Sequence, residues 1–134
     1  MSTAASASIR APADTIRFNI ELANISAPGL PVVFTETNYT TAPGIRGSVS
    51  EAVQAKYDLD LIMDAVQAGV KATFFYELLD QFPDPAQTSN EWHFGLFRAD
   101  GSPKPAATAI HNLTSILADT GNAAESFSPG TLGY

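Results

Sequence analysis

The stretch PVVFTE, residues 31–36, decides the fold class of this chain. Its β-branched and aromatic residues form a continuous run without polar alternation, which is typical of a strand buried on both faces. A second run of this kind, ATFFYE, occupies residues 72–77. Because a helical segment lies between the two runs, we expect parallel strands joined by a crossover helix, an α/β architecture.

Helical patterns precede and follow the two predicted strands. Residues 14–25 fit a helix that Asp14 caps, although the apolar residues of this segment also alternate as in a strand. A final helix is expected from about Pro103, with one apolar face formed by Ala106, Ile110, Leu113 and Leu117. The predicted order is therefore helix, strand, helix, strand and helix.

The middle helix is predicted to begin at a capping box of Ser48 and Glu51 and to end near Ala68. Its expected apolar face consists of Ala52, Ala55, Leu59, Ile62 and Val66. The aspartates of this helix then lie on a solvated face, and their spacing matches no calcium-binding loop. This interpretation places three residues in water: Asp58, Asp60 and Asp64.

The charge balance narrows the classes of partner. The 134 residues include 14 acidic and 7 basic side chains, so the net charge is −7. Phosphate recognition needs clustered Lys and Arg, which excludes nucleic-acid binding as an expected function. The chain has no cysteine, no glycine-rich phosphate motif and no histidine-rich pattern, so we expect neither a cofactor nor a metal site. No apolar run is long enough to predict a membrane span, and no signal peptide is recognisable, which leaves the localisation open.

Candidate functional residues follow the predicted strands. In α/β proteins the carboxyl ends of the strands carry the site, so Glu36 and Glu77 are candidates for a nucleophile, a base or a sugar-binding group. The alternative for Glu36 is a structural role, as a cap or as the partner of an arginine. Aromatic rings beside carboxylates suit a sugar, because the ring stacks on the sugar face while the carboxylates accept hydrogen bonds from its hydroxyls. The further candidates for sugar contact are Tyr39, Tyr76, Asp80 and Trp92, and Trp92 could equally close the end of the core.

Three segments, in this order, resemble parts of glycoside hydrolases with a (β/α)8 barrel, from the clan of cellulase-like and β-xylosidase-like retaining enzymes. Residues 30–39 (LPVVFTETNY) are similar to the seventh strand of that barrel, and residues 76–81 (YELLDQ) to the eighth strand and its loop. Residues 94–106 (FGLFRADGSPKPA) are similar to the stretch that opens the final barrel helix. The resemblance implies a partial TIM barrel that contains only the last strands and helices.

The resemblance also implies that Glu36 is the nucleophile of a retaining glycosidase. In the family the eighth strand often ends in a tryptophan that lies under the sugar, and Tyr76 stands near that position in this chain. Retaining hydrolysis needs a second carboxyl group about 5–5.5 Å from the first, acting as acid and then as base. In the family this glutamate follows an asparagine after the fourth strand, and the pair Asn90-Glu91 lies too late in the chain to fill that place. The isolated chain is therefore expected to be inactive, and whether it is an enzyme stays open.

The length leads to the same expectation. A complete barrel has eight strands and about 250 residues, whereas this chain has 134 residues. We expect residues 14–118 to be the barrel portion, with residues 1–13 as a flexible segment and residues 119–134 as a linker or tail. The expected partners are a carbohydrate and either the missing part of the barrel or a second copy of the chain. Two alternatives stay open: a non-catalytic carbohydrate-contacting or assembly module on the same scaffold, and an independent α/β domain whose likeness to a barrel is fortuitous.

Overall fold

The computed structural model describes residues 10–86 and 88–118, so most of the predicted flexible segment and the predicted tail lie outside the described residues. The described chain contains the helices α1 (Pro12–Ser26), α2 (Glu51–Gln67) and α3 (Pro105–Leu117), the strands β1 (Val33–Thr37) and β2 (Ala72–Phe75), and the short 3-10 helix η1 (Glu91–His93). The predicted order of helix, strand, helix, strand and helix is confirmed.

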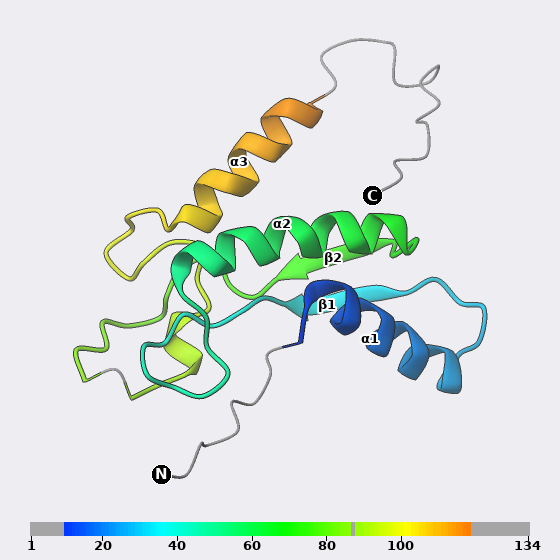
Figure 1. The fold of residues 1–134 in the computed structure, drawn as a ribbon, viewed down its shortest axis with the longest axis horizontal. Helices are drawn as coiled ribbons and strands as arrows, with labels where there is room; N and C mark the ends of the chain where they lie inside the picture. The colour runs from blue at the N-terminus through cyan, green and yellow to red at the C-terminus, as the bar shows by residue number, and fades with distance from the viewer. Residues whose placement is uncertain (1–9, 87, 119–134) are drawn as a thin grey trace, which may run out of the picture.

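The two strands form a parallel sheet, and α2 connects them (Figure 1). Val33 pairs with Ala72 and Phe34 with Thr73, but the next pair is Thr37 with Phe75. β1 therefore has two residues between the last two pairs where β2 has one, which is a β-bulge in β1. The predicted α/β class with parallel strands is confirmed.

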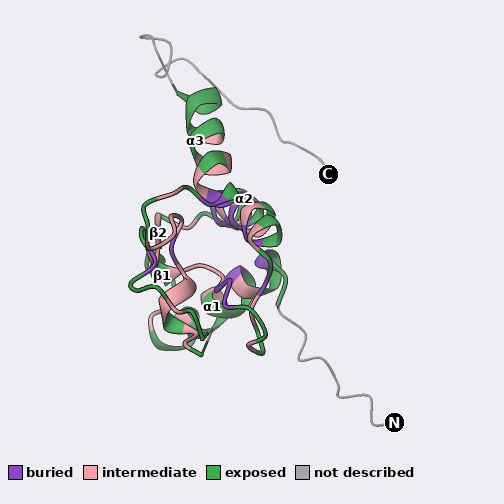
Figure 2. Ribbon diagram, turned by 90° about the vertical axis from the view of Figure 1, so that its left-hand side faces the viewer, coloured by how far each residue is buried: buried purple, intermediate pink, exposed green. Residues whose placement is uncertain are grey.

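The core lies between the helices and one face of this sheet. Its centre consists of Ile16, Leu61 and Ala65. Phe34 of β1 and Phe75 of β2 pack against that centre, and Figure 2 shows α1 and α2 on the same side of the strands. The other face is open, since Val33 is 46% and Phe74 59% exposed. The expectation of strands buried on both faces is therefore wrong for the described residues, because only one of the two faces has helices to pack against.

The first helix is confirmed, but its predicted cap is wrong. α1 begins at Pro12, and no side chain caps it. Proline suits the first turn of a helix because the N–H group that it lacks has no partner there. Asp14 lies inside the first turn, where it accepts a hydrogen bond from Arg17 at 2.6 Å.

The middle helix is capped two residues later than predicted, at Ser50 instead of Ser48. The side chain of Ser50, not that of Ser48, accepts the hydrogen bond from the Val53 N–H at 3.3 Å. The Ser48 hydroxyl donates instead to the Ala42 carbonyl at 2.6 Å, within the loop before α2. The predicted end is confirmed, since α2 stops at Gln67 and is capped by Ala68.

The predicted apolar face of α2 is wrong, and so is the solvated position of Asp58. The buried residues of α2 are Gln54, Asp58, Leu61 and Ala65. They recur at steps of four, three and four, which is one face of a helix. Val66, assigned to the apolar face, is 68% exposed, whereas Asp58 is fully buried. The pattern misleads because two of the four buried positions carry polar side chains.

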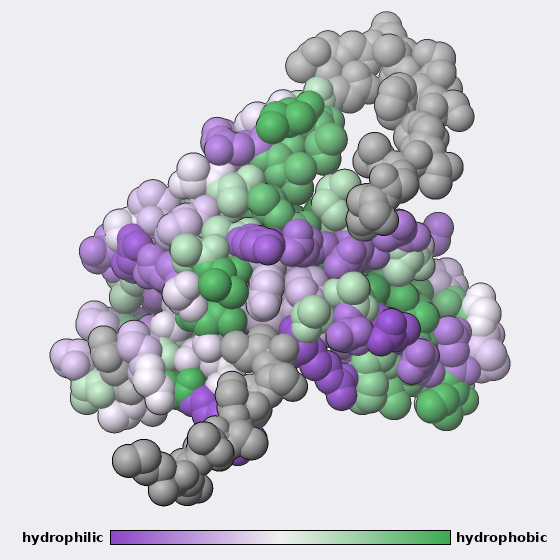
Figure 3. Space-filling view, in the orientation of Figure 1, coloured by the Kyte–Doolittle hydropathy of each residue, from purple (hydrophilic) through white to green (hydrophobic). Residues whose placement is uncertain are grey.

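The last helix begins at Pro105 and packs against α2. Pro103, the predicted start, lies in a bridge with Phe97 instead. Figures 1 and 2 show that α3 extends away from the body of the molecule, and its predicted apolar face is buried only at Ala106. Its far end is apolar and open (Figure 3), with Ile116 79% and Leu117 64% exposed. No helix among the described residues has the length and apolar character needed to cross a bilayer.

Candidate functional site

The bulge in β1 brings Glu36 to the open face of the sheet. Exposed and half-buried residues alternate from Val33 to Thr35, and the bulge then interrupts this alternation. Thr35 and Glu36 are therefore both exposed, while Thr37 is again half-buried. With strict alternation Glu36 would share the face of Phe34, which packs on the helices. Bulges re-aim side chains in this way, and they are over-represented next to active sites.

Glu36 lines a cleft of about 400 Å³ beyond the carboxyl ends of the two strands. The residues around the cleft are Glu36, Thr37, Asn38, Tyr76, Glu91 and Phe94. The rings of Tyr76 and Phe94 meet edge-on, with centroids 5.9 Å apart. The Tyr76 hydroxyl accepts a hydrogen bond from Gln81 Nε2 at 2.7 Å, which holds the ring at the cleft. Two carboxylates and two aromatic rings thus share one open cleft, a combination suited to a hydroxyl-rich ligand.

The loop that follows Glu36 is anchored to the buried face of α2. The Asn38 side chain donates to the Phe94 carbonyl at 2.6 Å, which links this loop to the opposite wall of the cleft. Gln54 is fully buried, and its Nε2 donates to the Tyr39 carbonyl at 2.9 Å and to Asn38 Oδ1 at 3.3 Å. A buried amide therefore holds the segment two to three residues after Glu36.

Glu77 follows Tyr76 through a cis peptide bond. Its Oε2 accepts a hydrogen bond from Gln81 at 3.3 Å, while Oε1 is buried without a hydrogen-bond partner in the described structure. Burial raises the pKa of Glu77, the Gln81 hydrogen bond opposes that rise, and the charge of Asp80 adds to it. A carboxyl group whose pKa is raised in this way is a candidate for proton transfer.

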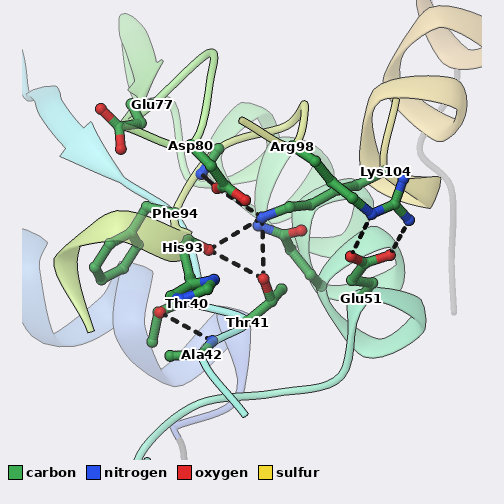
Figure 4. Close-up of polar contacts among 12 residues, drawn as sticks. Thr40, Thr41, Ala42, Glu51, Glu77, Asp80, His93, Phe94, Arg98 and Lys104 are labelled. Carbon is green, nitrogen blue, oxygen red and sulfur yellow. Dashed lines mark hydrogen bonds and ion pairs between the residues drawn. The ribbon is translucent and has the colours of Figure 1, made fainter. Parts of the chain in front are cut away.

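A buried lysine joins the loops that support the cleft (Figure 4). Lys104, 1% exposed, donates from Nζ to Asp80 Oδ1 at 2.8 Å, to Thr41 Oγ1 at 3.0 Å and to the His93 carbonyl at 3.2 Å. Asp80 follows β2, Thr41 follows β1, and His93 ends η1. Three segments far apart in the sequence are thereby held at one ammonium group, just before α3 begins.

Gly95 completes this arrangement by close backbone packing. Its N–H donates to Asp80 Oδ1 at 2.8 Å, so Asp80 receives a second hydrogen bond beside that of Lys104. A Cβ atom at this position would lie 2.2 Å from the backbone nitrogen of Asp80 and 2.5 Å from the Phe97 carbonyl oxygen. No other residue type fits here without a shift of the backbone.

A second cleft of about 350 Å³ lies beside the lysine network, and its lining includes Asp80, His93, Arg98 and Glu51. Arg98 and Glu51 form a bidentate pair across it, with Arg98 Nε 2.9 Å from Glu51 Oε1 (Figure 4). This hydrogen bonding raises the pKa of Arg98. The pair ties the start of α2 to the turn before α3.

The structure brings two of the six predicted site residues into one cleft, namely Glu36 and Tyr76. The Tyr39 ring lies on the helix side, 5.1 Å from the ring of Tyr57. Trp92 lies in η1, with its ring 5.5 Å from that of Phe82. Asp80 accepts hydrogen bonds from Lys104 and the Gly95 N–H, and Glu77 accepts one from Gln81. A role in sugar contact stays a prediction for all of these residues.

Sequence reasoning missed the two buried polar groups that support the cleft, Gln54 and Lys104. Gln54 shares a helix face with Asp58, and a polar pair four residues apart offers no hydrophobic signal. Lys104 lies within the KPA stretch of the segment at residues 94–106, which was the available signal. Within residues 10–86 and 88–118, no group of three or more His, Asp or Glu side chains is arranged to hold a metal ion.

Comparison with solved structures relates the chain to parts of larger glycosidases. It superposes on the family 17 β-1,3-glucanosyltransferase of Rhizomucor miehei with a TM-score of 0.56 and 27% identity, over 70% of this chain and 35% of that one. An uncultured Clostridium sp. β-glucuronidase gives a TM-score of 0.60 at 18% identity, over 78% and 19% of the two chains. A family 39 glycoside hydrolase of Bacteroides cellulosilyticus WH2 gives 0.56 at 22% identity, over 79% and 20%.

These matches define the class of fold. The chain is a small α/β piece, with parallel strands and helices, that matches part of TIM-barrel glycosidases, and the resemblance inferred from the sequence is confirmed. It spans between about a fifth and a third of the length of the three structures named here. No protein-family model matches the sequence, and neither does any curated protein.

Proposed function

We propose that this chain supplies one wall of a glycosidase active site, in which Glu36 acts as the nucleophile of a retaining mechanism. The observation that carries the proposal is the position of Glu36, which stands at the bulge of β1 and lines a cleft together with Tyr76 and Phe94. The match to parts of three kinds of glycoside hydrolase supports the same chemistry.

In this mechanism the Glu36 carboxylate attacks the anomeric carbon, and the bond to the leaving-group oxygen breaks as a proton reaches that oxygen. Water then releases the sugar from Glu36. The Tyr76 ring offers a stacking surface to the sugar, and the Asn38 segment keeps the carboxylate loop in place. Glu91 and Glu77 bring further carboxyl groups to this end of the sheet, but their places in the chain differ from that of the usual acid/base glutamate. We therefore expect no turnover by the isolated chain.

The experiment compares Glu36→Gln with wild type in two forms of the protein. As isolated chains, neither the wild type nor Glu36→Gln should hydrolyse aryl glycosides. In a barrel completed by the missing units, Glu36→Gln should lower the rate of hydrolysis by about 10³-fold or more, as expected for loss of a nucleophile. Glu21→Gln, an exposed change on α1, is the matched control and should leave the rate unchanged. Full activity of Glu36→Gln in a completed barrel contradicts the assignment.

The second candidate function is a non-catalytic carbohydrate-contacting module. The edge-on ring pair of Tyr76 and Phe94 beside open carboxylates favours it, because rings and carboxylates of this kind are able to contact a sugar without any cleavage. Titration with neutral oligosaccharides, followed by NMR shifts of the Asn38 and Tyr76 signals, detects this binding. Binding that survives Glu36→Gln, with no hydrolysis by the completed barrel, supports the module rather than the enzyme.

A further inference from the structure

Three oxygen atoms on the buried face of α2 have no hydrogen-bond donor among the described residues. They are Oε1 of Gln54 and both carboxylate oxygens of Asp58. Both residues are fully shielded from solvent, each with 0% exposure. An ionised carboxylate is an acceptor only, and burying it without a donor is costly. The face therefore lacks a donor rather than an acceptor.

The nearby cation does not supply that donor. The positive charge of Lys104 acts on Asp58 and lowers its pKa against the effect of burial. An ammonium group has three N–H bonds to donate. All three are used elsewhere (Figure 4), because Lys104 donates to Asp80, Thr41 and the His93 carbonyl.

The other titratable groups around α2 do not supply the donor either. The Tyr39 hydroxyl, in the loop after β1, donates to the Arg10 carbonyl at 3.4 Å. Burial raises the pKa of Tyr39, and the negative charge of Asp58 adds to that rise. The remaining charged or titratable residues on the elements packed against α2 are exposed, namely Asp14, Arg17 and Glu21 on α1, Glu36 on β1 and His111 on α3.

One proton on Asp58 would satisfy two of the three oxygens at once. Gln54 and Asp58 are four residues apart on the buried face of α2, a spacing at which Gln and Asp side chains hydrogen-bond on a helix. Protonation turns one Asp58 oxygen into a donor, and Gln54 Oε1 is the acceptor beside it that has no other partner. Burial raises the pKa of Asp58 to about 7, which agrees with a neutral carboxyl group in the fold.

Gln54 connects this carboxyl group to the loop after Glu36. Its Nε2 donates to the Tyr39 carbonyl at 2.9 Å and to Asn38 Oδ1 at 3.3 Å. An ionised Asp58 would attract that same Nε2, because a hydrogen bond to a charged acceptor is stronger than one to a neutral acceptor. Turning the amide toward Asp58 would place Oε1 against two other acceptors, and the loop would lose its anchor.

We propose that neutral Asp58 donates to Gln54 Oε1, and that loss of this proton to solvent turns the Gln54 amide and releases residues 38–39 beside Glu36. Asp58 is thus a positioning residue that acts through Gln54. The inference rests on the proposed function only where the position of this loop is taken to control Glu36.

The first experiment is an NMR titration of the isolated chain, ¹³C-labelled at its aspartate carboxyl groups, from about pH 5 to about pH 9. We expect the Asp58 signal to titrate with a midpoint of about 7. The Gln54 side-chain amide should follow the same midpoint, and so should the Tyr39 N–H, which donates to Asn38 Oδ1 at 2.7 Å. Titration of Asp58 near its ordinary value of about 4 overturns the proposal, as does a midpoint of about 7 that the other two signals do not follow.

The second experiment measures hydrogen exchange of the Tyr39 N–H relative to that of Leu61, which lies in the core and reports global opening. In wild type this ratio should rise by roughly fivefold or more above the midpoint. Asp58→Asn keeps an N–H donor for Gln54 at every pH and should hold the ratio low, whereas the exposed control Asp60→Asn should behave as wild type. Gln54→Met removes both ends of the amide and should give the high ratio at every pH. A ratio that rises equally in wild type and Asp58→Asn contradicts the proposal.

The outcomes separate this switch from catalysis. In a completed barrel, Asp58→Asn should shift the alkaline limb of the rate profile and Asp60→Asn should not; a limb that Asp58→Asn leaves unchanged overturns the control of the site. Coupled NMR signals together with full activity of Glu36→Gln refute the proposed function and leave the switch intact. Uncoupled signals overturn the switch and leave the role of Glu36 untouched.

Discussion

Replacing Lys104 with methionine tests whether one buried ion pair holds the loops of the cleft together. The Lys104 ammonium and the Asp80 carboxylate lie 2.8 Å apart, and the two residues are 1% and 6% exposed. Methionine keeps most of the length of lysine and removes its charge. The substitution therefore leaves the Asp80 carboxylate buried beside an apolar side chain, which is the costly way to break such a pair.

The magnitude follows from the contacts that are lost. Removing one partner of a buried ion pair typically lowers the free energy of unfolding by about 3–5 kcal/mol. The Gly95 N–H still donates to Asp80, which favours the lower part of this range. Lys104 also loses its hydrogen bonds to Thr41 and to the His93 carbonyl, each worth roughly 1 kcal/mol. We expect a loss of about 4 kcal/mol, which lowers the Tm by roughly 10 °C or more in a domain of this size.

Urea unfolding at micromolar concentration, followed by far-UV circular dichroism, measures this change. Lys56→Met, an exposed change on α2, is the matched control and should stay within about 0.5 kcal/mol of wild type. The double variant Lys104→Met/Asp80→Asn removes the stranded charge and keeps an acceptor for Gly95. It should recover at least about 1 kcal/mol relative to Lys104→Met alone. A loss below about 1 kcal/mol for Lys104→Met, or purely additive losses in the double variant, refutes the reasoning.

Three further predictions concern stability. Burial raises the pKa of Asp58 from 3.8 to about 7, so the folded state retains a proton that the unfolded state releases, and wild-type stability falls as the pH rises from about 4 to 7. Asp58→Asn should remove this dependence, with a gain over wild type that grows by up to about 4 kcal/mol between pH 4 and pH 8 in urea titrations; a gain independent of pH contradicts it. Gly95→Ala should lower the free energy of unfolding by about 2–3 kcal/mol, because its Cβ meets the backbone of Asp80, and a neutral result in thermal melts would show that the loop yields easily. Glu51→Gln breaks the half-exposed pair with Arg98 and should cost about 0.5 kcal/mol at low salt and less in 1 M NaCl; equal losses at both salt concentrations would show that charge is not the cause.

The element order and the strand ends were predictable because they depend on local pattern. The apolar run that ends at Glu36 and the one that ends at Glu77 are read directly from the sequence, and their pairing follows from the helix between them. Gly69, with φ +75°, follows the predicted end of α2, and the left-handed conformation found there is the reason why a glycine marks such an end.

The buried face of α2 was not predictable, because its polar residues have partners that are distant in the sequence. Gln54 is buried since it can donate to the Tyr39 carbonyl, fifteen residues away, and no periodicity reveals that bond. Asp58 is harder still, since both of its carboxylate oxygens are buried without a hydrogen-bond partner in the described structure. The hydrophobic pattern therefore placed Asp58 in solvent and gave Gln54 no role. As a result, the predicted buried face of α2 is rotated about the helix axis relative to the observed one.

The sequence predicted Glu36 as a site residue but not most of the residues that surround it in the cleft. The reason is again that their contacts are distant in the sequence. A carboxylate at a strand end is a local feature, but the cleft depends on Phe94 and Glu91, which reach Glu36 only through the folding of the long loop after β2. The Lys104 network that secures this loop joins segments up to 63 residues apart, and pattern analysis carries no information at that range.

The β-bulge of β1 makes the spacing of residues in this strand as important as their identity. Inserting one residue into β2 between Thr73 and Phe75 would keep every side chain that lines the cleft, yet it would give both strands two residues between the paired positions and so remove the bulge. With strict alternation the Glu36 carboxylate would then turn toward the face of Phe34, which packs on the helices. Substitution scanning, which preserves length, would miss this sensitivity. In related chains, the number of residues in this strand relative to that in its paired strand is therefore the feature to compare when judging whether the carboxylate is presented to a ligand.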